Sequence, residues 1–553
     1  MQLEYKRPNV KEDIETFENI LDLLKTETNV QKTLLLIQKI NTIRESFFSM
    51  EWISYISYLQ DTQNSFFQEE EQFFARYTPV MENLKLTYYQ VLKESPIKET
   101  LQKEIGEKVF LMADCASSLR SEEVAKNKKK IKILANEYGT LMSKAIIPFQ
   151  GENVTLKQLK KYKISFDRNI RKKAHETEAI FMESIEEKID TILEKLIQER
   201  TEYAHKLGFT SYTDVGYLEM YRIGYGKKEV NQFCEEIATY LVPYIQKLKE
   251  KQRENLDISS FYYYDNNTLF KDGNAKIKGD SSQILEIGKK IYKEISPAIY
   301  TVFKMMVDEK LLDVESRKGK SAGGITTYIP TIKKPIFISN FNGTSGDISV
   351  LTHEFGHSLQ LYESRDLLYY ENWWPTFDTC EIHSTSMQLL MLPHIEPFFI
   401  SKKDASKFAY ESLLSILELT CTACMGEQFQ QMIYDNPSFS KEKRKQVWHD
   451  LEQKYQPWIR YENNAYLEKG NGYQKINHFF GNPFYYIDYA LANIVSLQLY
   501  RKSVQNEKEA WDIYMTLCKQ GGKYPFIETV QKAHLKSPFE KGVVKELTRS
   551  LSL

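Results

Sequence analysis

Residues 347–357 read Asp-Ile-Ser-Val-Leu-Thr-His-Glu-Phe-Gly-His, and this stretch decides the fold and the chemistry that we expect of the chain. Its apolar residues recur near helical spacing, so the stretch predicts an α-helix that opens at Asp347. His353 and His357 are four residues apart, which places both imidazoles on one face of that helix. Two imidazoles so placed can bind one metal ion, and Glu354 beside them can take a proton from metal-activated water. The alternative is a surface helix with two incidental histidines.

The residues before this helix predict a strand and a turn. Residues 335–340 form a short segment rich in β-forming side chains, and residues 342–346 carry Asn, Gly, Thr and Ser, which favour turns. Strand, turn and metal-binding helix therefore follow one another along the chain. The strand has two interpretations, which are ordinary sheet core and a sheet edge that pairs with an extended peptide.

A metal held by two histidines needs a third protein ligand. One class of metal sites continues the pentad with Gly and His at fixed spacing, but Gln360 and Glu363 occupy those positions here. The next segment offers four candidates, namely Glu371, Asp378, Glu381 and His383. Glu381 begins a run that reads as a second helix ending at Pro393, and a carboxylate there would complete a His₂Glu zinc site. His383 is the main rival as a ligand, and Glu381 has the alternative role of stabilising the start of its helix.

With these residues in view, the chain resembles the thimet oligopeptidase and oligoendopeptidase F family of zinc peptidases, and within it the Pz-peptidase-like bacterial branch. The segments that carry the resemblance are residues 341–345 (Phe-Asn-Gly-Thr-Ser), the pentad at 353–357, residues 377–384 (Phe-Asp-Thr-Cys-Glu-Ile-His-Ser), and His478 with residues 482–490 (Asn-Pro-Phe-Tyr-Tyr-Ile-Asp-Tyr-Ala). The resemblance continues more weakly upstream and covers the chain from about residue 110 onward.

The resemblance implies a mainly α, two-lobed zincin-type fold, with a small β-sheet beside the metal-binding helix and a deep substrate channel. It implies that His353, His357 and Glu381 bind one Zn²⁺ ion. It also implies that a histidine and tyrosines of the distal segment face the substrate carbonyl, with His478 and Tyr489 as donors and Tyr486 as a further candidate. The stretch between His478 and the tyrosines is compact here, which leaves open whether residue 485, 486 or 489 is the main donor.

The distal segment has a physical rationale of its own. Peptide hydrolysis passes through a tetrahedral oxyanion, and one phenol or imidazole donor stabilises such a charge by about 3 kcal/mol. Tyr486 and Tyr489 are three residues apart, on one face if the segment is helical. The alternative is apolar core, because the chain has 36 tyrosines. Two glycines in residues 469–473 predict either a flexible loop that closes on substrate or a plain surface turn.

Composition excludes several classes of protein. The 553 residues carry a net charge of −1, which leaves no basic surface for nucleic acid or for an anionic membrane. The N-terminus has no signal-peptide pattern, and no stretch approaches the ~20 apolar residues of a membrane helix. We therefore expect a cytoplasmic protein with neither a membrane nor a nucleic-acid partner, and its oligomeric state stays open.

The six cysteines do not form a disulfide framework. Cys421 and Cys424 make a lone C-x-x-C in a helical stretch, which we interpret as helix packing. Cys380 adjoins the proposed ligand Glu381, so its thiol could be oxidised or capture metal, although packing is the simpler role.

The pattern along the chain predicts two domains. Residues 1–195 read as an N-terminal helical lobe with a small hairpin near 146–156, and residues 196–553 read as the catalytic domain. The function implied is that of a zinc-dependent oligoendopeptidase that cuts internal bonds of short peptides with metal-activated water. Two rivals are a zinc hydrolase of a non-peptide substrate and a catalytically silent peptide-binding protein. The intact Glu354 argues against the silent protein.

Overall fold

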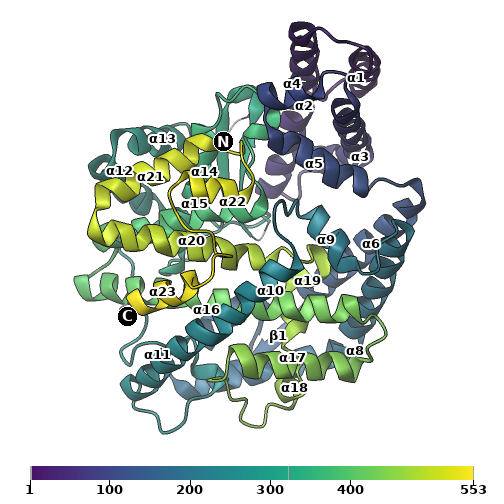
Figure 1. Ribbon diagram of the computed structural model, residues 1–553. Helices are drawn as coiled ribbons and strands as arrows, with labels where there is room; N and C mark the ends of the chain where they lie inside the picture. Colours follow the sequence, from purple (N-terminus) through teal and green to yellow (C-terminus); the bar gives the residue numbers. More distant parts are fainter. Residues whose placement is uncertain (1–2, 322, 552–553) are drawn as a thin grey trace. The chain divides into compact units, whose positions relative to one another are not determined.

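The computed structural model describes residues 3–321 and 323–551, and 71% of the residues are helical, which confirms the mainly α fold. The chain forms two compact units, and each unit is assembled from three segments. Unit 1 contains residues 1–118, 276–406 and 495–535, and unit 2 contains residues 119–275, 407–494 and 536–553. The predicted ranges 1–195 and 196–553 do not coincide with these interleaved units, because residue 195 lies inside the long helix α8 (Arg168–Lys206) of unit 2 (Figure 1).

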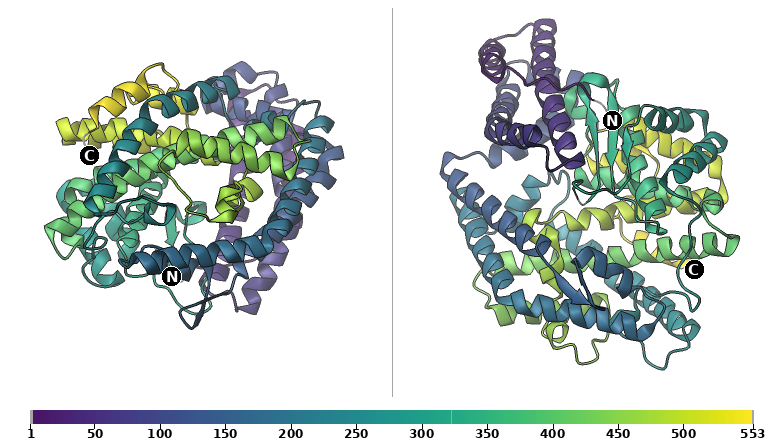
Figure 2. Two further views of the ribbon diagram at one scale, coloured as in Figure 1. Left: turned by 90° about the horizontal axis from the view of Figure 1, so that it is seen from below. Right: turned by 180° about the vertical axis from the view of Figure 1, so that it is seen from behind.

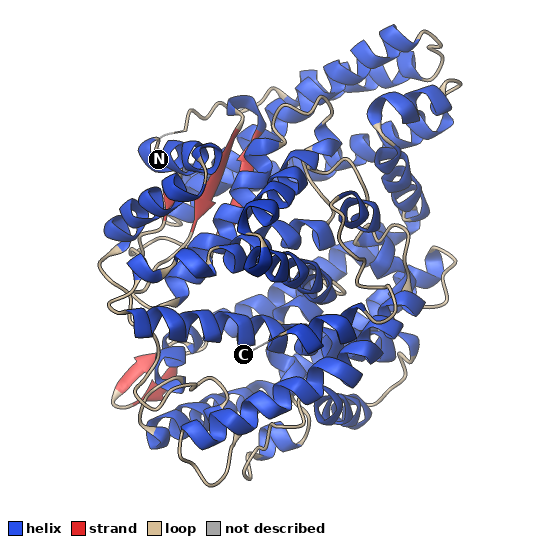
Figure 3. Ribbon diagram, turned by 60° about the vertical axis from the view of Figure 1, so that its left-hand side comes forward, coloured by secondary structure: helices blue, strands red, loops and turns tan. Residues whose placement is uncertain are grey.

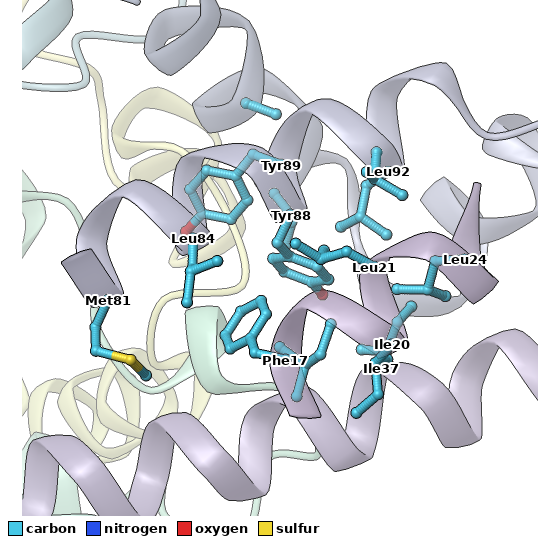
Figure 4. Packing of buried hydrophobic residues seen from close by; sticks show 14 of the residues in the cluster. Phe17, Ile20, Leu21, Leu24, Ile37, Met81, Leu84, Tyr88, Tyr89 and Leu92 are labelled. Carbon is cyan, nitrogen blue, oxygen red and sulfur yellow. The ribbon is translucent and has the colours of Figure 1, made fainter. Parts of the chain in front are cut away.

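Unit 1 begins with a group of five helices, which are α1 (Val10–Leu24), α2 (Val30–Gln60), α3 (Ser65–Glu94), α4 (Lys98–Ile105) and α5 (Glu107–Ser118). The side chains of Asn29 and Asn64 accept hydrogen bonds from the first free backbone N–H groups of α2 and α3, which fixes where these helices start. Helices α1, α2 and α3 lie side by side (Figure 2). Their facing sides bury one apolar core, in which Phe17 of α1 and Ile37 of α2 pack with Tyr88 of α3 (Figure 4).

The rest of unit 1 surrounds a small sheet (strands red in Figure 3). Its elements are α12 (Ser281–Ile295), α13 (Pro297–Asp308), β3 (Leu312–Asp313), β4 (Ile325–Ile329), β5 (Lys334–Ile338), α14 (Gly346–Glu363), α15 (Phe377–Leu390), α21 (Glu507–Gln520) and α22 (Phe526–Lys532). The strand order is β3-β5-β4, with β3 parallel and β4 antiparallel to β5. The strand predicted at 335–340 is therefore β5. Of its two interpretations, the sheet core is correct and the sheet edge is wrong, because β5 has a partner on both sides.

Helix α14 carries the pentad and rests on this sheet. It contacts β4 and β5 on one side and α15 on another. Phe355, within the pentad, is fully buried against Tyr292 of α12 and Phe303 of α13, with ring centroids 4.6 and 4.9 Å away. This apolar anchor fixes the rotation of α14 about its axis. The predicted order of strand, turn and helix, with a small sheet beside the helix that carries the pentad, is confirmed.

Unit 2 is helical apart from one hairpin. Its elements are α6 (Ala125–Ser143), β1 (Ile147–Phe149), β2 (Glu152–Val154), α7 (Leu156–Lys163), α8, α9 (Tyr212–Glu219), α10 (Lys227–Glu236), α11 (Val242–Asn255), α17 (Lys441–Tyr455), α18 (Ala465–Glu468), α19 (Asn477–Gly481) and α23 (Val543–Ser550). Strands β1 and β2 pair antiparallel, with Ile147 opposite Val154, so the hairpin predicted near 146–156 is confirmed.

Two helices cross the boundaries between segments of the two units, namely α16 (Lys402–Asp435) and α20 (Tyr486–Gln505). Helix α16 is long and apolar enough to cross a membrane by length and composition alone, so the expectation that no stretch approaches a membrane helix is wrong by this criterion. A core helix meets the same criterion, and 56% of its most apolar window is buried inside the protein. Cys421 and Cys424 lie on this helix and are fully buried free thiols, as expected for helix packing.

Candidate metal centre and aromatic cluster

The structure brings His353, His357 and Glu381 together. The two histidines lie on α14 with ring centroids 5.0 Å apart, and Glu381 lies in the second turn of α15. Glu381 Oε2 is 3.6 Å from His353 Nε2 and 3.8 Å from His357 Nε2. Three donors that each lie about 2.0–2.1 Å from one zinc ion stand roughly 3.3 Å apart, so the donor set and its spacing fit zinc. Within the described residues, this is the one group of His, Cys, Asp and Glu side chains close enough to hold a metal ion.

Neighbouring polar side chains orient two of these donors. His353 Nδ1 lies 3.1 Å from Gln388 Oε1, while Gln388 Nε2 donates to the carbonyl of Ser349 at 3.3 Å. The amide oxygen of Gln388 can only accept, so His353 carries its proton on Nδ1 and leaves Nε2 free for a metal. Ser384 Oγ donates to Glu381 Oε2 at 2.9 Å. The sequence offers one signal for Gln388, which is its helical spacing of seven residues from Glu381.

His357 is held neutral by its surroundings. Burial, together with a smaller effect of the neighbouring His353, lowers the pKa of His357 to about 3. A neutral imidazole is the form that binds metal. The Nδ1 atom of His357 lies 3.4 Å from Cys380 Sγ. Burial raises the pKa of the Cys380 thiol well above its usual value. Cys380 therefore contacts a proposed ligand without belonging to the metal-binding group.

Gly356 allows α14 and α15, which carry the three proposed metal ligands, to approach closely. A Cβ at this position would lie 2.6 Å from the carbonyl oxygen of His383 and 2.8 Å from Ser384 Cα, both on α15. No other residue type fits this contact without a shift of the helices. The glycine inside the pentad therefore sets the spacing between α14, which carries the histidines, and α15, which carries Glu381.

Glu354 lies beside the metal-binding group and is anchored from the sheet. Thr326 Oγ1, on the edge strand β4, donates to Glu354 Oε2 at 2.6 Å. The bond holds one carboxylate oxygen and leaves the other for a second partner. Nothing in the sequence pointed to Thr326, because it lies 28 residues before Glu354 on a strand that only the fold brings near.

The structure also places the rival ligands. Glu371 forms a buried ion pair with Arg44 at 2.6 Å. Asp378 accepts hydrogen bonds from Thr376 Oγ1 and from the backbone N–H of Thr379, near the start of α15. His383 is fully buried, and burial lowers its pKa to about 4. None of the three belongs to the group of side chains that could share a metal.

The distal candidates form a separate cluster within unit 2. His478, at the start of α19, stacks on Tyr485 and Tyr486, with centroids 5.2 and 5.5 Å away, and meets Tyr489 edge-on at 6.1 Å. We call these four residues the aromatic cluster. Burial raises the pKa of Tyr486 to about 12, so its phenol stays protonated and able to donate. Tyr485, which the sequence leaves open as an alternative donor to Tyr486 and Tyr489, is thus also a member of the cluster.

The segment 469–473 is packed against α17, an arrangement that favours neither of its two interpretations, the flexible closing loop or the plain surface turn. A Cβ on Gly470 would lie 2.1 Å from the carbonyl oxygen of Lys445, and a Cβ on Gly472 would lie 2.6 Å from Trp448 Nε1. Tyr473 is fully buried, and its hydroxyl donates to Asp190 at 2.8 Å. The glycines serve close approach and not flexibility.

Comparison with known proteins identifies the family. A model of Peptidase family M3 matches residues 161–549, and a model of the Peptidase M3 N-terminal domain matches residues 1–119. Oligopeptidase PepF of Bacillus subtilis (strain 168) is 22% identical over 504 residues, which cover 86% of this chain and 73% of that protein.

Two solved structures resemble this protein over nearly the whole length of its chain. The structure of Pz peptidase A with inhibitor 2 is 38% identical, has a TM-score of 0.93, and covers 99% of this chain and 97% of its own. A crystal structure from Bacillus anthracis str. Ames, assigned to oligoendopeptidase F, is also 38% identical, with a TM-score of 0.88 over 99% of this chain and 96% of its own. These matches confirm the resemblance and give no support to the non-peptide hydrolase. The chain therefore belongs to peptidase family M3 and is a metallo-oligoendopeptidase.

Proposed function

We propose that this enzyme uses one zinc ion, held by His353, His357 and Glu381, to cut internal bonds of short peptides. The observation that carries the proposal is the convergence of three donor atoms, all within 4.8 Å of one another, on two tightly packed helices. When bound, zinc would polarise the substrate carbonyl and make water a stronger acid. The neutral state of His357 and the outer contact of His353 suit this role.

Glu354 is the proposed base. Its carboxylate, held through Oε2 by Thr326, takes a proton from the attacking water and passes it to the leaving amine. The aromatic cluster supplies the proposed oxyanion donors, with His478 and Tyr489 as the main ones and Tyr486 as a third. A donor that acts on the developing charge contributes more to the transition state than to substrate binding.

The outer edge of β4 is the proposed pairing site for the peptide main chain. Within the described residues β4 pairs only with β5, and Thr326 on β4 contacts Glu354, so a peptide added along this edge would pass beside the base. Pairing through main-chain groups favours breadth over strict side-chain selectivity. A site enclosed in a channel, as the family resemblance implies, would restrict substrates to short peptides.

We further propose a cytoplasmic enzyme without a nucleic-acid partner. The net charge of −1 supports the absence of such a partner. All six cysteines are free thiols, which suits a reducing compartment.

The test combines a variant with a substrate series. Glu354→Gln should retain zinc and lose nearly all turnover, while Glu363→Gln, a carboxylate on the last turn of the same helix, should retain both. Peptides of about five to twenty residues should be cut internally, and a native globular protein should stay intact, as measured by mass spectrometry. Substantial turnover by zinc-loaded Glu354→Gln would remove Glu354 as the base. Rapid cleavage of the native protein would show that the site is open.

A further inference from the structure

The turn before the aromatic cluster holds a bulky residue in an unusual backbone conformation. Phe484 has a φ of 66°, in the left-handed region that favours glycine, so the turn is strained and persists only because its surroundings fix it. The ring is fully buried between Tyr217 and Tyr434, with both centroids 5.6 Å away. It also fills the space over Gly216, where a Cβ would lie 2.3 Å from the ring. The N–H of Phe484 donates to Gln430 Oε1 at 2.9 Å.

A buried arginine binds the other polar group of this turn. Arg222 Nη2 donates to the carbonyl oxygen of Phe484 and to Asp488 Oδ1, the latter at 3.1 Å. Asp488 lies in the first turn of α20, between Tyr486 and Tyr489. One guanidinium therefore joins the strained turn to the helix that presents two members of the aromatic cluster.

A second buried arginine binds the chain directly after His478. Arg200 Nη1 donates to the carbonyl oxygen of Phe479 at 2.9 Å, and Arg200 Nη2 donates to that of Phe480 at 2.6 Å. Arg200 is fully buried, and Arg222 is 7% exposed. Arg222 Nη1 also lies 3.8 Å from the carboxylate oxygen Oε1 of Glu427. Each buried guanidinium therefore uses both of its terminal nitrogens, in a planar geometry that an ammonium cannot copy.

We propose that Arg200 and Arg222 are positioning residues, which hold residues 478–489 in the shape that presents the aromatic cluster to the substrate. The inference rests on the proposed function, in which His478 and Tyr489 donate to the oxyanion. Neither arginine acts on the substrate itself. Arg200 acts through the main chain next to His478, and Arg222 acts through the main chain of Phe484 and the carboxylate of Asp488.

The experiment replaces each arginine by lysine, which keeps the charge and removes the fork. Arg200→Lys and Arg222→Lys should each lower kcat at least tenfold, with KM and bound zinc within twofold of the parent enzyme. Arg444→Lys is the matched control, because Arg444 is a buried arginine of the same unit that donates to Phe439 O at 2.8 Å, away from the segment. The control should leave kcat, KM and zinc unchanged. Arg222→Ala should regain part of its kcat when a low concentration of guanidinium ion is added, and Arg444→Ala should not respond.

Two further variants keep the outcome decisive. Gly216→Ala pushes the ring of Phe484 without touching a charge, so it should lower kcat selectively even if Arg222→Lys fails to fold. Tyr489→Phe, assayed in parallel, should lower kcat about 100-fold. A normal kcat for Tyr489→Phe would overturn the proposed oxyanion role and the inference with it. A lower kcat in Tyr489→Phe, together with a normal kcat in Arg200→Lys, Arg222→Lys and Gly216→Ala, would overturn the inference about the arginines and leave the proposed oxyanion role in place.

Discussion

A methyl group at Gly356 would enter the interface of α14 and α15 at its tightest point, so Gly356→Ala tests whether helix spacing sets the metal centre. The new Cβ would lie 2.6 Å from His383 O, and an ordinary C···O contact of about 3.4 Å requires that α15 retreat by about 0.8 Å. His357 follows Gly356 directly, and Glu381 precedes His383 by two residues. The shift would therefore change the distance between His357 Nε2 and Glu381 Oε2, which is 3.8 Å.

Zinc sites tolerate deviations of only about 0.2 Å in ligand distance, so a shift of this size should weaken zinc binding about 10–100-fold. Overpacking lowers the free energy of unfolding by about 1–3 kcal/mol, and the better helix propensity of alanine offsets about 1 kcal/mol of this loss. Gly356→Ala should thus lose affinity for zinc with only a modest loss of stability. Turnover at saturating zinc should fall as well, because Glu354 is carried on the displaced helix.

The assay is a competition titration of zinc against a coloured chelator, together with urea denaturation of the zinc-free protein. Gly139→Ala is the control, because Gly139 lies inside α6 and no other group comes within 4 Å of the position that its new methyl would take. This control should keep its zinc affinity and gain up to about 1 kcal/mol in stability. An unchanged zinc affinity in Gly356→Ala would refute the argument that the glycine sets the spacing of the ligands.

Three further predictions concern single side chains. Glu381→Ala should lose bound zinc while His383→Ala retains it, measured by metal analysis of folded protein, and the reverse result would exchange their roles. Thr326→Val should lower kcat/KM about tenfold at full zinc occupancy, because Glu354 loses the donor that orients it, whereas Thr326→Ser should stay near the parent value. Burial raises the pKa of Glu452 to about 7 from 4.5, so the neutral carboxyl stabilises the fold below about pH 4.5 and this contribution is lost as the pH rises through 7. In urea titrations, Glu452→Gln should therefore have the same unfolding free energy as the parent protein at pH 4. At pH 8 its unfolding free energy should be higher by up to about 3 kcal/mol. Equal unfolding free energies at pH 8 would contradict this.

Local sequence pattern predicts the helix with the two histidines, whereas tertiary structure is needed to find the proposed third ligand, Glu381. The pentad places two imidazoles on one face through helix geometry alone. His353 and His357 can therefore be predicted as a ligand pair without knowledge of the fold. The candidates for the third ligand differ only in which of them faces α14. That depends on the contact of α14 with α15, which no spacing along the chain specifies.

The sequence leaves two interpretations open for residues 335–340 and two for residues 469–473, and in both cases the choice depends on distant residues. Residues 335–340 were recognised as a strand, but their place in the sheet depends on partners at Leu312–Asp313 and Ile325–Ile329, and the first of these is only two residues long. The segment 469–473 was recognised by its glycines, but whether a glycine gives flexibility or close approach depends on what lies opposite it. Both properties are set by residues far away in sequence.

Glycine position connects these findings to function. Gly356 leaves room for the backbone of α15, Gly216 for the ring of Phe484, and Gly472 for the indole of Trp448. At each of these positions a Cβ would lie within 2.6 Å of the neighbouring group. Such contacts make rigid structure, because interiors packed at crystal-like density leave no room for adjustment. The metal-binding group and the aromatic cluster both depend on a contact of this kind. Catalytic groups must be held to within about 0.5 Å to act together, and a glycine opposite a backbone or a ring provides that precision where a mobile loop would not.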